Sequence, residues 1–370
     1  MRPRLVNVKI IMMFHPKFTI TSTILQNIGQ IEASKAIIDA SPIIPAYEKQ
    51  FQQDAIVRAV HYGTKLEGNE LSFSEAAQVI EGKKVFAAKR DIQEVINYRQ
   101  VMNYLENLLN QDKSKTNCYN QEVLLQIHRL TVEKIVSPDQ AGRFRQVQVS
   151  IRNTATDELF YRPPPPMEVP YLIEDFFAWL LSPEADKMHP VLKSGIVHYV
   201  LAAIHPFTEG NGRTARAMAT LVLMREGYNI RRLFALEEYF DRHAEQYYNS
   251  LQAVSFQPGE LSDKDATVWL EFFTTALRDE LKKIEDKVRQ LSSDIHLKKQ
   301  LGDKQIPLNE RQIKLVEYMR QYGGLRIADA KEIFPMISDD TIWRDLRKLI
   351  AAGIVEKRGS TKGAYYCLKN

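Results

Sequence analysis

The sequence has few of the features that mark secreted, membrane or dedicated nucleic-acid-binding proteins. Only two cysteines occur among 370 residues, Cys118 and Cys367, and they lie far apart without metal-ligand spacing. Two isolated thiols favour a reducing compartment over a disulfide framework, so we expect a cytoplasmic protein. No apolar run is long enough to span a bilayer. The net charge of +4 gives no overall basic excess of the kind expected for a nucleic-acid binder.

The rest of the composition is that of a globular protein, with 44% hydrophobic and 26% charged residues in a chain long enough for two or three domains. The first residues are basic and then apolar, which predicts an N-terminal tail or a start at Met12 or Met13. The pattern predicts a tail at 1–45, a helical region at 46–110, the main domain at 111–290, a linker at 291–306 and a C-terminal domain at 307–370.

Apolar residues at helical spacing predict a mainly α fold. The predicted helices are 48–66, 74–80, 88–110, 121–134, 168–181, 190–204, 213–226, 241–254 and 264–290. The exception is 144–162, where Val147, Val149 and Ile151 alternate with polar residues, as in a half-buried strand. Turn residues at 153–157 and a return strand at 159–161 complete a predicted β-hairpin, which the prolines at 163–166 close.

The C-terminal domain has the pattern of a winged helix-turn-helix, with helices at 308–322, 327–334 and 338–352 followed by two strands. Its third helix carries charges of both signs. The acidic residues are Asp339, Asp340 and Asp345, and the basic residues are Arg344, Arg347 and Lys348. Acidic groups near DNA phosphates are unfavourable. DNA binding through 307–370, protein docking and a purely structural role therefore all stay open.

The most informative segment is His205-Pro-Phe-Thr-Glu-Gly-Asn-Gly-Arg-Thr-Ala-Arg216, which connects two apolar helical patterns. The N-terminus of the second helix presents unpaired N–H groups and a positive dipole end, which favour phosphate. Arg213 and Arg216 add positive charge on one face, and Glu209 offers an oxygen ligand suited to Mg²⁺. His205 has the side chain best suited to act as a base near neutral pH.

This segment contains every fixed position of His-Pro-Phe-x-(Asp/Glu)-Gly-Asn-Gly-Arg-x-x-Arg, and it therefore resembles the core motif of Fic-domain proteins. The resemblance implies a helical Fic domain that transfers AMP from ATP to a Ser, Thr or Tyr hydroxyl of a target protein. The implied roles are a general base for His205, a Mg²⁺ ligand for Glu209, α-phosphate binding by the Asn211 side chain, β-phosphate binding by Arg213 and γ-phosphate binding by Arg216. The turn of Gly210, Asn211 and Gly212 would bring backbone N–H groups to phosphate oxygens.

Two accessory segments extend the resemblance. Gly142-Arg-Phe-Arg145 matches the start of the family's flap, a hairpin that holds an extended target segment by strand addition. The implied target-binding residues are Val147, Gln148, Val149 and Ser150. Tyr247 and Tyr248 match the region that borders the adenine in the family, although Asp241 stands where asparagine is common. Both tyrosines are equally compatible with core positions.

A possible built-in inhibitor lies upstream, in Gly63-Thr-Lys-Leu-Glu67-Gly68-Asn69. It resembles the inhibitory motif (Ser/Thr)-x-x-x-Glu-(Gly/Asn) of Fic proteins regulated by an N-terminal helix, and it implies that Glu67 pairs with Arg216. A guanidinium held by a carboxylate is not available to a γ-phosphate. Gly63 departs from the motif, because Ser or Thr is usual there. A plain helix end capped by Gly68 and Asn69 is the alternative.

We therefore expect an ATP- and Mg²⁺-dependent protein adenylyltransferase, inhibited by Glu67 and capable of auto-modification. Two alternatives remain: a DNA-bound regulator whose Fic domain senses a nucleotide, and a Fic enzyme that removes AMP because the glutamate orients a water. The target protein, the preferred nucleotide and the oligomeric state are not specified by the residues.

Overall fold

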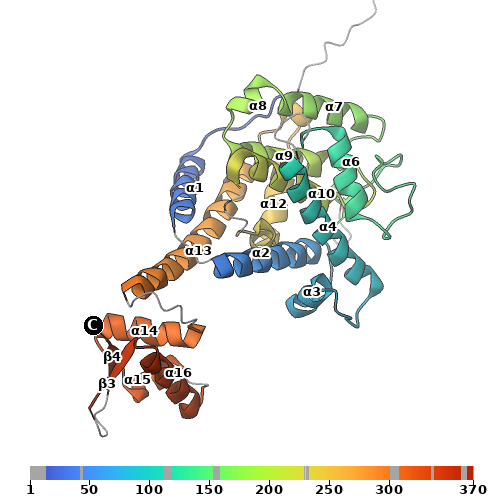
Figure 1. Cartoon of the computed structure of the whole chain (residues 1–370). Coiled ribbons are helices and arrows are strands. Elements are labelled where there is room, and N and C mark those ends of the chain that lie inside the picture. The colour runs from blue at the N-terminus through green and yellow to red at the C-terminus, as the bar shows by residue number, and fades with distance from the viewer. Residues whose placement is uncertain are drawn as a thin grey trace, which may run out of the picture. The chain divides into compact units, whose positions relative to one another are not determined.

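The computed structural model describes residues 14–41, 45–111, 118–152, 159–228, 230, 233–300, 308–334, 337–359 and 365–369. The described chain divides into two compact units, one formed by residues up to Lys287 and one from Val288 onwards. Both are mainly helical (Figure 1), as the sequence predicts. Within the described residues, none of the helices has the length and apolar character needed to cross a membrane.

The first unit is built around the helical hairpin of α9 (Pro190–Ile204) and α10 (Asn211–Leu223), which pack against each other along their lengths. Almost every residue of α9 is buried, because other elements surround it. The other elements of this unit are α1 (Ser22–Ala40), α2 (Pro45–Lys65), α3 (Phe73–Ile80), α4 (Lys89–Gln111), α6 (Gln121–Thr131), α7 (Val169–Leu180), α8 (Pro183–Lys187), η1 (Met224–Tyr228), α11 (Leu236–Arg242), α12 (Ala244–Ser255), η3 (Leu261–Asp263) and most of α13 (Thr267–Gln300).

Three helices bring distant parts of the sequence to the α9–α10 hairpin. α4 and α6 both pack against α10, and α2 packs against α4 and α11. A capping box begins α3, in which Ser72 and Glu75 each bond the other's backbone N–H. Contacts of Glu67 with Gly212 and of Arg90 with Glu209 place the end of α2 and the start of α4 beside the turn between α9 and α10.

Residues 22–40, predicted as part of a tail, instead form the ordered helix α1. This helix packs on α13 through side-chain hydrogen bonds. The Asn27 amide donates to Thr274 and Thr275, and the Ser34 hydroxyl donates to Glu285 at 2.7 Å. The prediction for residues 1–13 lies outside the described part of the chain.

The predicted hairpin is present but shorter than expected. Strand β1 (Ile151–Arg152) pairs with β2 (Leu159–Tyr161), with Ile151 opposite Tyr161, whereas the alternation predicted a strand from Val147. Continuing that register would place 147–149 opposite 163–165, which are all prolines without an N–H to donate. Side chains bond there instead, since Gln148 Nε2 donates to the Pro163 carbonyl at 2.9 Å.

The predicted linker at 291–306 is helical in its first part, because α13 continues through Gln300. No glycine or proline occurs between 291 and 300, so nothing in the backbone chemistry ends the helix there. The remaining linker residues lie outside the described part of the chain.

The second unit contains α14 (Glu310–Tyr322), α15 (Ile327–Ile333), α16 (Asp339–Ala351), β3 (Val355–Arg358) and β4 (Tyr365–Leu368). β3 and β4 are antiparallel, and Leu325 forms a further bridge to Tyr366. Apolar residues from all three helices and both strands form its core. Three helices followed by a small sheet give the winged helix-turn-helix arrangement predicted from the sequence.

Candidate active site

The turn between α9 and α10 is bracketed by two residues in the left-handed conformation. His205, at φ 50°, ends α9, and Gly210, at φ 75°, precedes α10. A positive φ at a histidine is uncommon and occurs often at functional sites. At Gly210 a Cβ would lie 2.7 Å from the Val132 side chain. This position therefore requires glycine both for its conformation and for its contact with the end of α6.

His205 has the protonation state that a general base needs. Its Nδ1 lies 3.3 Å from the Ala202 carbonyl, which only accepts a hydrogen bond, so Nδ1 carries the proton and Nε2 is left as the basic atom. Burial lowers the pKa of His205 to about 4, although the Ala202 carbonyl and Glu67 oppose that shift. The imidazole is therefore neutral at physiological pH.

Asn211 closes the turn. Its Oδ1 accepts from the Phe207 N–H at 2.9 Å, and its Nδ2 donates to the Phe207 carbonyl at 2.8 Å. Both amide atoms thus hold the turn, and its predicted side-chain contact with an α-phosphate remains a prediction. The first N–H groups of α10 belong to Asn211, Gly212 and Arg213, and helix geometry gives them no intrahelical acceptor. The turn therefore presents an anion-binding helix terminus.

Arg213 belongs to a closed ring of four charged side chains. It is fully buried, with Nη1 at 3.3 Å from Glu94 and Nη2 at 3.2 Å from Glu209. Arg90 completes the ring, since it lies 3.2 Å from Glu94 and 3.1 Å from Glu209. Two of these residues come from α4 and two from the turn and α10. The ring fixes Glu209 beside the N-terminus of α10.

Arg216 is held by the end of α2. Its Nη2 donates to Glu67 Oε1 at 2.7 Å and to the Gly63 carbonyl at 2.8 Å. A Cβ on Gly212 would collide with Glu67 Oε1, so this carboxylate lies directly over the first turn of α10. Burial acts to raise the pKa of Glu67, but Arg216 and Arg213 lower it more, so the side chain is a carboxylate.

The Tyr98 side chain on α4 explains why position 63 is a glycine and not the usual Ser or Thr. A Cβ at this position would lie 2.5 Å from the Tyr98 ring. The Tyr98 hydroxyl donates to Glu237 at 3.0 Å, and both residues are buried. The space that a Ser or Thr side chain would need is therefore filled by Tyr98.

Asn69 connects the same segment to the charged ring. Its Nδ2 donates to Glu94 at 3.1 Å and to the Asp91 carbonyl at 3.0 Å. Lys65, at the end of α2, donates to Asp241 at 2.8 Å. The aspartate that departs from the family pattern is therefore an ion-pair partner of α2.

A cavity of about 690 Å³ opens beside these residues, which is the size of an ordinary ligand site. It collects segments from α2, the hairpin, α9, α10 and α12. Its lining includes Glu67, Ile151, His205, Gly212, Arg216, Glu245, Tyr247, Tyr248 and Gln252. Of the two tyrosines, Tyr247 is also a core residue, 2% exposed, and Tyr248 donates to the Leu66 carbonyl at 2.9 Å.

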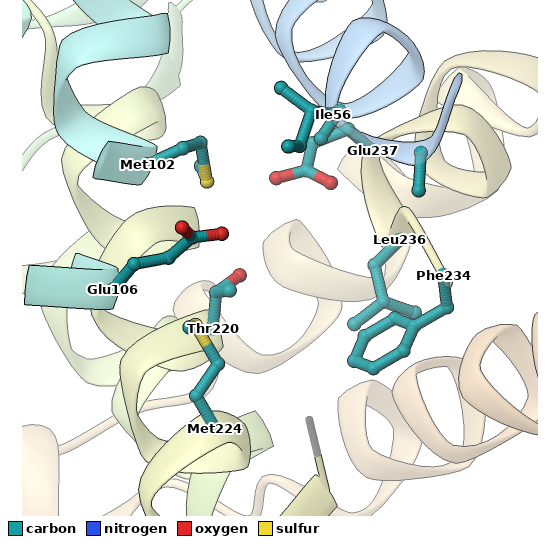
Figure 2. Close-up of a pocket in the computed structure, with 10 residues that line it drawn as sticks. Ile56, Met102, Glu106, Thr220, Met224, Phe234, Leu236 and Glu237 are labelled. Carbon is teal, nitrogen blue, oxygen red and sulfur yellow. The ribbon is translucent and has the colours of Figure 1, made fainter. Parts of the chain in front are cut away.

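A second cavity lies between α2, α4, α10 and the start of α11 (Figure 2). Glu106 and Glu237 approach it from opposite sides, among apolar side chains such as Ile56 and Met102. Its volume is about 60 Å³, far below that of a nucleotide pocket. The larger cavity is therefore the candidate active site.

The residues in and beside that cavity fit a nucleotide with Mg²⁺. Among the described residues, the buried Nε atoms of Arg213 and Arg216 have no hydrogen-bond acceptor, and anionic oxygens would satisfy them. No group of three or more potential metal-binding side chains occurs in the described chain. A single carboxylate such as Glu209 suits Mg²⁺ that takes its other ligands from phosphates and water.

Comparison with known families agrees with this geometry. Residues 118–223 match the model of the Fic/DOC family, and residues 311–360 match that of a DeoR-like helix-turn-helix domain. Residues 118–223 are a Fic/DOC domain. The candidate site is thus built from this Fic domain together with α2, α4 and α12, which lie outside the matched range, and the C-terminal unit contains the helix-turn-helix domain.

Curated relatives carry the name protein adenylyltransferase Fic. The relative from Culex quinquefasciatus is 26% identical over 64% of this chain and 45% of its own length. That from Nematostella vectensis is 30% identical over 49% of this chain and 40% of its own length. The chain therefore spans less than half the length of these relatives.

Solved structures extend the similarity over both units. A Fic family protein from Desulfovibrio desulfuricans matches 96% of this chain and 98% of its own, with a TM-score of 0.62 at 25% identity. Fic-1 from C. elegans matches 74% of this chain and 73% of its own with a TM-score of 0.56. At 21% identity the latter match shows the fold alone.

The structure brings six of the fourteen predicted site residues to one cavity and adds residues that were not predicted. Glu67, His205, Gly212, Arg216 and both tyrosines line one cavity. Val147, which precedes the hairpin, is 58% exposed, and the roles of the flap residues remain predictions. Sequence reasoning missed Arg90, Glu94 and His128. Only the spacing of Arg90 and Glu94, four residues apart on one helix face, was visible.

Proposed function

We propose that the protein is a protein adenylyltransferase, which transfers AMP from ATP to a Ser, Thr or Tyr hydroxyl of a target protein. The observation that carries this proposal is the shared cavity of a neutral His205, with Nε2 available, and the anion-binding start of α10. The names of the curated relatives support the same reaction.

In the proposed reaction, His205 Nε2 removes the proton from the target hydroxyl. The hydroxyl oxygen forms a bond to the α-phosphorus of ATP, the bond from that phosphorus to the bridging oxygen breaks, and pyrophosphate leaves. The N–H groups of α10 hold the phosphates, and Arg213 and Arg216 balance the charge on the leaving group. Mg²⁺, held by Glu209, would supply further neutralisation of the phosphates.

We also propose that Glu67 inhibits this reaction. Its carboxylate holds Arg216 at 2.7 Å and lies over Gly212, where phosphate oxygens would approach α10. Nucleotide and Glu67 therefore compete for the same guanidinium and the same helix terminus.

The test uses ATP labelled at either the α- or the γ-phosphate. The full chain incubated with Mg²⁺ and α-labelled ATP is expected to label itself or lysate proteins, while γ-labelled ATP gives no label. His205→Ala should abolish labelling and keep Mg·ATP binding. His15→Ala, at an exposed histidine bonded to Glu184, is the matched control. Labelling from the γ-phosphate, or unchanged labelling by His205→Ala, would contradict the proposal.

For the C-terminal unit, one observation favours duplex DNA as a partner. Two of the three acidic residues of α16 are already paired, since Asp345 is buried at 2.8 Å from Arg311 and Asp339 lies 2.9 Å from Lys331. The basic residues of this helix, Arg344, Arg347 and Lys348, are all exposed. The acids therefore oppose phosphate less than their number in the sequence indicates.

This DNA-binding proposal is tested on the full chain by fluorescence anisotropy with a random-sequence duplex over a series of salt concentrations. Affinity is expected to fall steeply with salt. Arg344→Ala with Arg347→Ala should reduce the log–log slope by about 0.9 for each phosphate that the variant no longer neutralises. Lys84→Ala, at an exposed lysine of the first unit, is the matched control. No binding at low salt would favour protein docking.

A further inference from the structure

His128, on α6, connects the two segments on which the proposed reaction depends. Its Nδ1 accepts from the Gly142 N–H at 2.9 Å, and its Nε2 lies 3.0 Å from the Glu209 carbonyl. A backbone N–H only donates and a carbonyl only accepts. The proton is therefore on Nε2, and both nitrogens of a neutral ring are in use.

The ring is also fixed by packing. It stacks on Phe207, with centroids 3.6 Å apart and planes within 2°, and it is 1% exposed. A Cβ at Gly210 would lie 3.8 Å from the His128 ring and closer still to Thr131 and Val132. The end of α6 thus lies directly against the catalytic turn, and rotation of the ring would break the stack and both hydrogen bonds.

Each of the two bonds reaches a different part of the site. Gly142 begins the segment in which Arg145 Nε donates to the His205 carbonyl at 2.8 Å and the Arg145 N–H donates to the Pro206 carbonyl. The Glu209 carbonyl belongs to the residue whose carboxylate is proposed to meet Mg²⁺. The segment from Gly142 to Arg145, which we call the flap base, and the turn between α9 and α10 are therefore linked through the His128 ring.

We propose that His128 is a positioning residue: its Nε2–H tautomer holds the flap base through Gly142 and the Glu209 backbone through its carbonyl, which sets both relative to His205. It contacts neither nucleotide nor target. The consequence for catalysis rests on the proposed function, whereas the link itself is a property of the fold.

Three variants separate the two bonds. His128→Asn keeps an acceptor near the Nδ1 position, and His128→Gln keeps a donor near the Nε2 position. His128→Phe keeps the stack on Phe207 and removes both bonds. A merely space-filling role would rank the variants by how well they pack, with His128→Phe closest to wild type. A positioning role predicts opposite defects in Asn and Gln.

The flap readout is amide hydrogen exchange of peptides covering 142–150. Exchange is expected to rise about fivefold to tenfold in His128→Phe and His128→Gln, and to stay near wild type in His128→Asn. The turn readout is calorimetric binding of Mg·ATP, which should weaken by about the same factor in His128→Phe and His128→Asn but not in His128→Gln.

A third readout reports the tautomer of the ring itself. Among the neutral imidazoles of the wild-type chain, selective ¹⁵N-histidine NMR should show an Nε2–H signal that is missing from His128→Phe. An Nδ1–H tautomer, or equal behaviour of Asn and Gln in both assays, would overturn the proposal. If the wild type does not bind Mg·ATP, the proposed adenylyltransferase function fails, but the exchange and NMR measurements still decide the role of His128.

Discussion

Replacing Glu67 by glycine tests the proposed inhibition of the site by this carboxylate. The carboxylate of Glu67 accepts from Arg216 at 2.7 Å, and its side chain is 25% exposed. It also covers Gly212, at the point where phosphate oxygens would meet the N–H groups of α10. Glu67→Gly removes this charge and its hydrogen bond to Arg216. The Gly63 carbonyl, at 2.8 Å from Arg216 Nη2, is left as an acceptor for the guanidinium.

The size of the effect follows from the hydrogen bond that the substitution removes. A hydrogen bond between two charged groups contributes about 1.5–3 kcal/mol, and a nucleotide must displace it before the γ-phosphate reaches Arg216. Each 1.4 kcal/mol corresponds to about tenfold in affinity. Mg·ATP binding by Glu67→Gly is therefore expected to tighten by about tenfold to a hundredfold, and auto-modification should rise well above wild type.

The assay combines calorimetry with incorporation of α-labelled ATP. Glu67→Gln, which keeps the shape and removes the charge, should give a smaller gain, and Glu70→Gln at an exposed neighbouring acid should give none. Glu67→Gly combined with Arg216→Ala should lose most of the gain. If the double variant keeps it, activation comes from loosening of α2. If Glu67→Gly changes neither binding nor transfer, Glu67 has no part in the mechanism.

Three further outcomes are expected. Gly63→Ser should lower the free energy of unfolding by about 1–3 kcal/mol in urea titrations, because a Cβ at this position would lie 2.5 Å from the Tyr98 ring. The loss should be smaller when Gly63→Ser is introduced into a Tyr98→Leu variant. Arg213→Ala should weaken ADP binding more than AMP binding in calorimetry, and equal losses would contradict its assignment to the β-phosphate. Burial lowers the folded-state pKa of His198 to about 3 and of His205 to about 4. The unfolded chain therefore binds more protons than the folded chain below about pH 6.5, and the free energy of unfolding should fall as pH drops from there to about 4, by up to about 1.4 kcal/mol per pH unit for each histidine. His198→Gln should make this slope shallower, and an unchanged slope would contradict the cause.

Each part of the site that the sequence predicted lies within a short motif of contiguous residues. The turn from His205 to Arg216 brings its own helix terminus, so spacing alone predicts an anion site. Arg90, Glu94 and His128 come from α4 and α6, and no local pattern distinguishes them from surface or core residues. Their roles depend on helix packing, which sequence periodicity does not determine.

The missed helix α1 shows why an apolar pattern can fail. Its buried residues are Ile24, Asn27, Ile31, Ser34 and Ile38, a stripe of heptad spacing in which two of five positions are polar. Asn27 and Ser34 interrupt the hydrophobic signal, but α13 satisfies their side chains with hydrogen bonds. A buried polar position is acceptable only when its partner is present, and that partner is about 250 residues away in the chain.

The site pairs its arginines with carboxylates, and this pairing connects the proposed inhibition with stability. Arg213 and Arg216 are at most 2% exposed, and a guanidinium buried without a counter-charge is strongly unfavourable. Glu94, Glu209 and Glu67 supply the missing charges before any nucleotide binds. Phosphates that reach these arginines must replace the carboxylates. The free energy of ATP binding therefore includes only the difference between an arginine–phosphate and an arginine–carboxylate interaction. A variant without Glu67 is therefore expected to bind ATP more tightly and, without nucleotide, to unfold at a lower temperature, because the ion pair between Glu67 and Arg216 affects both properties.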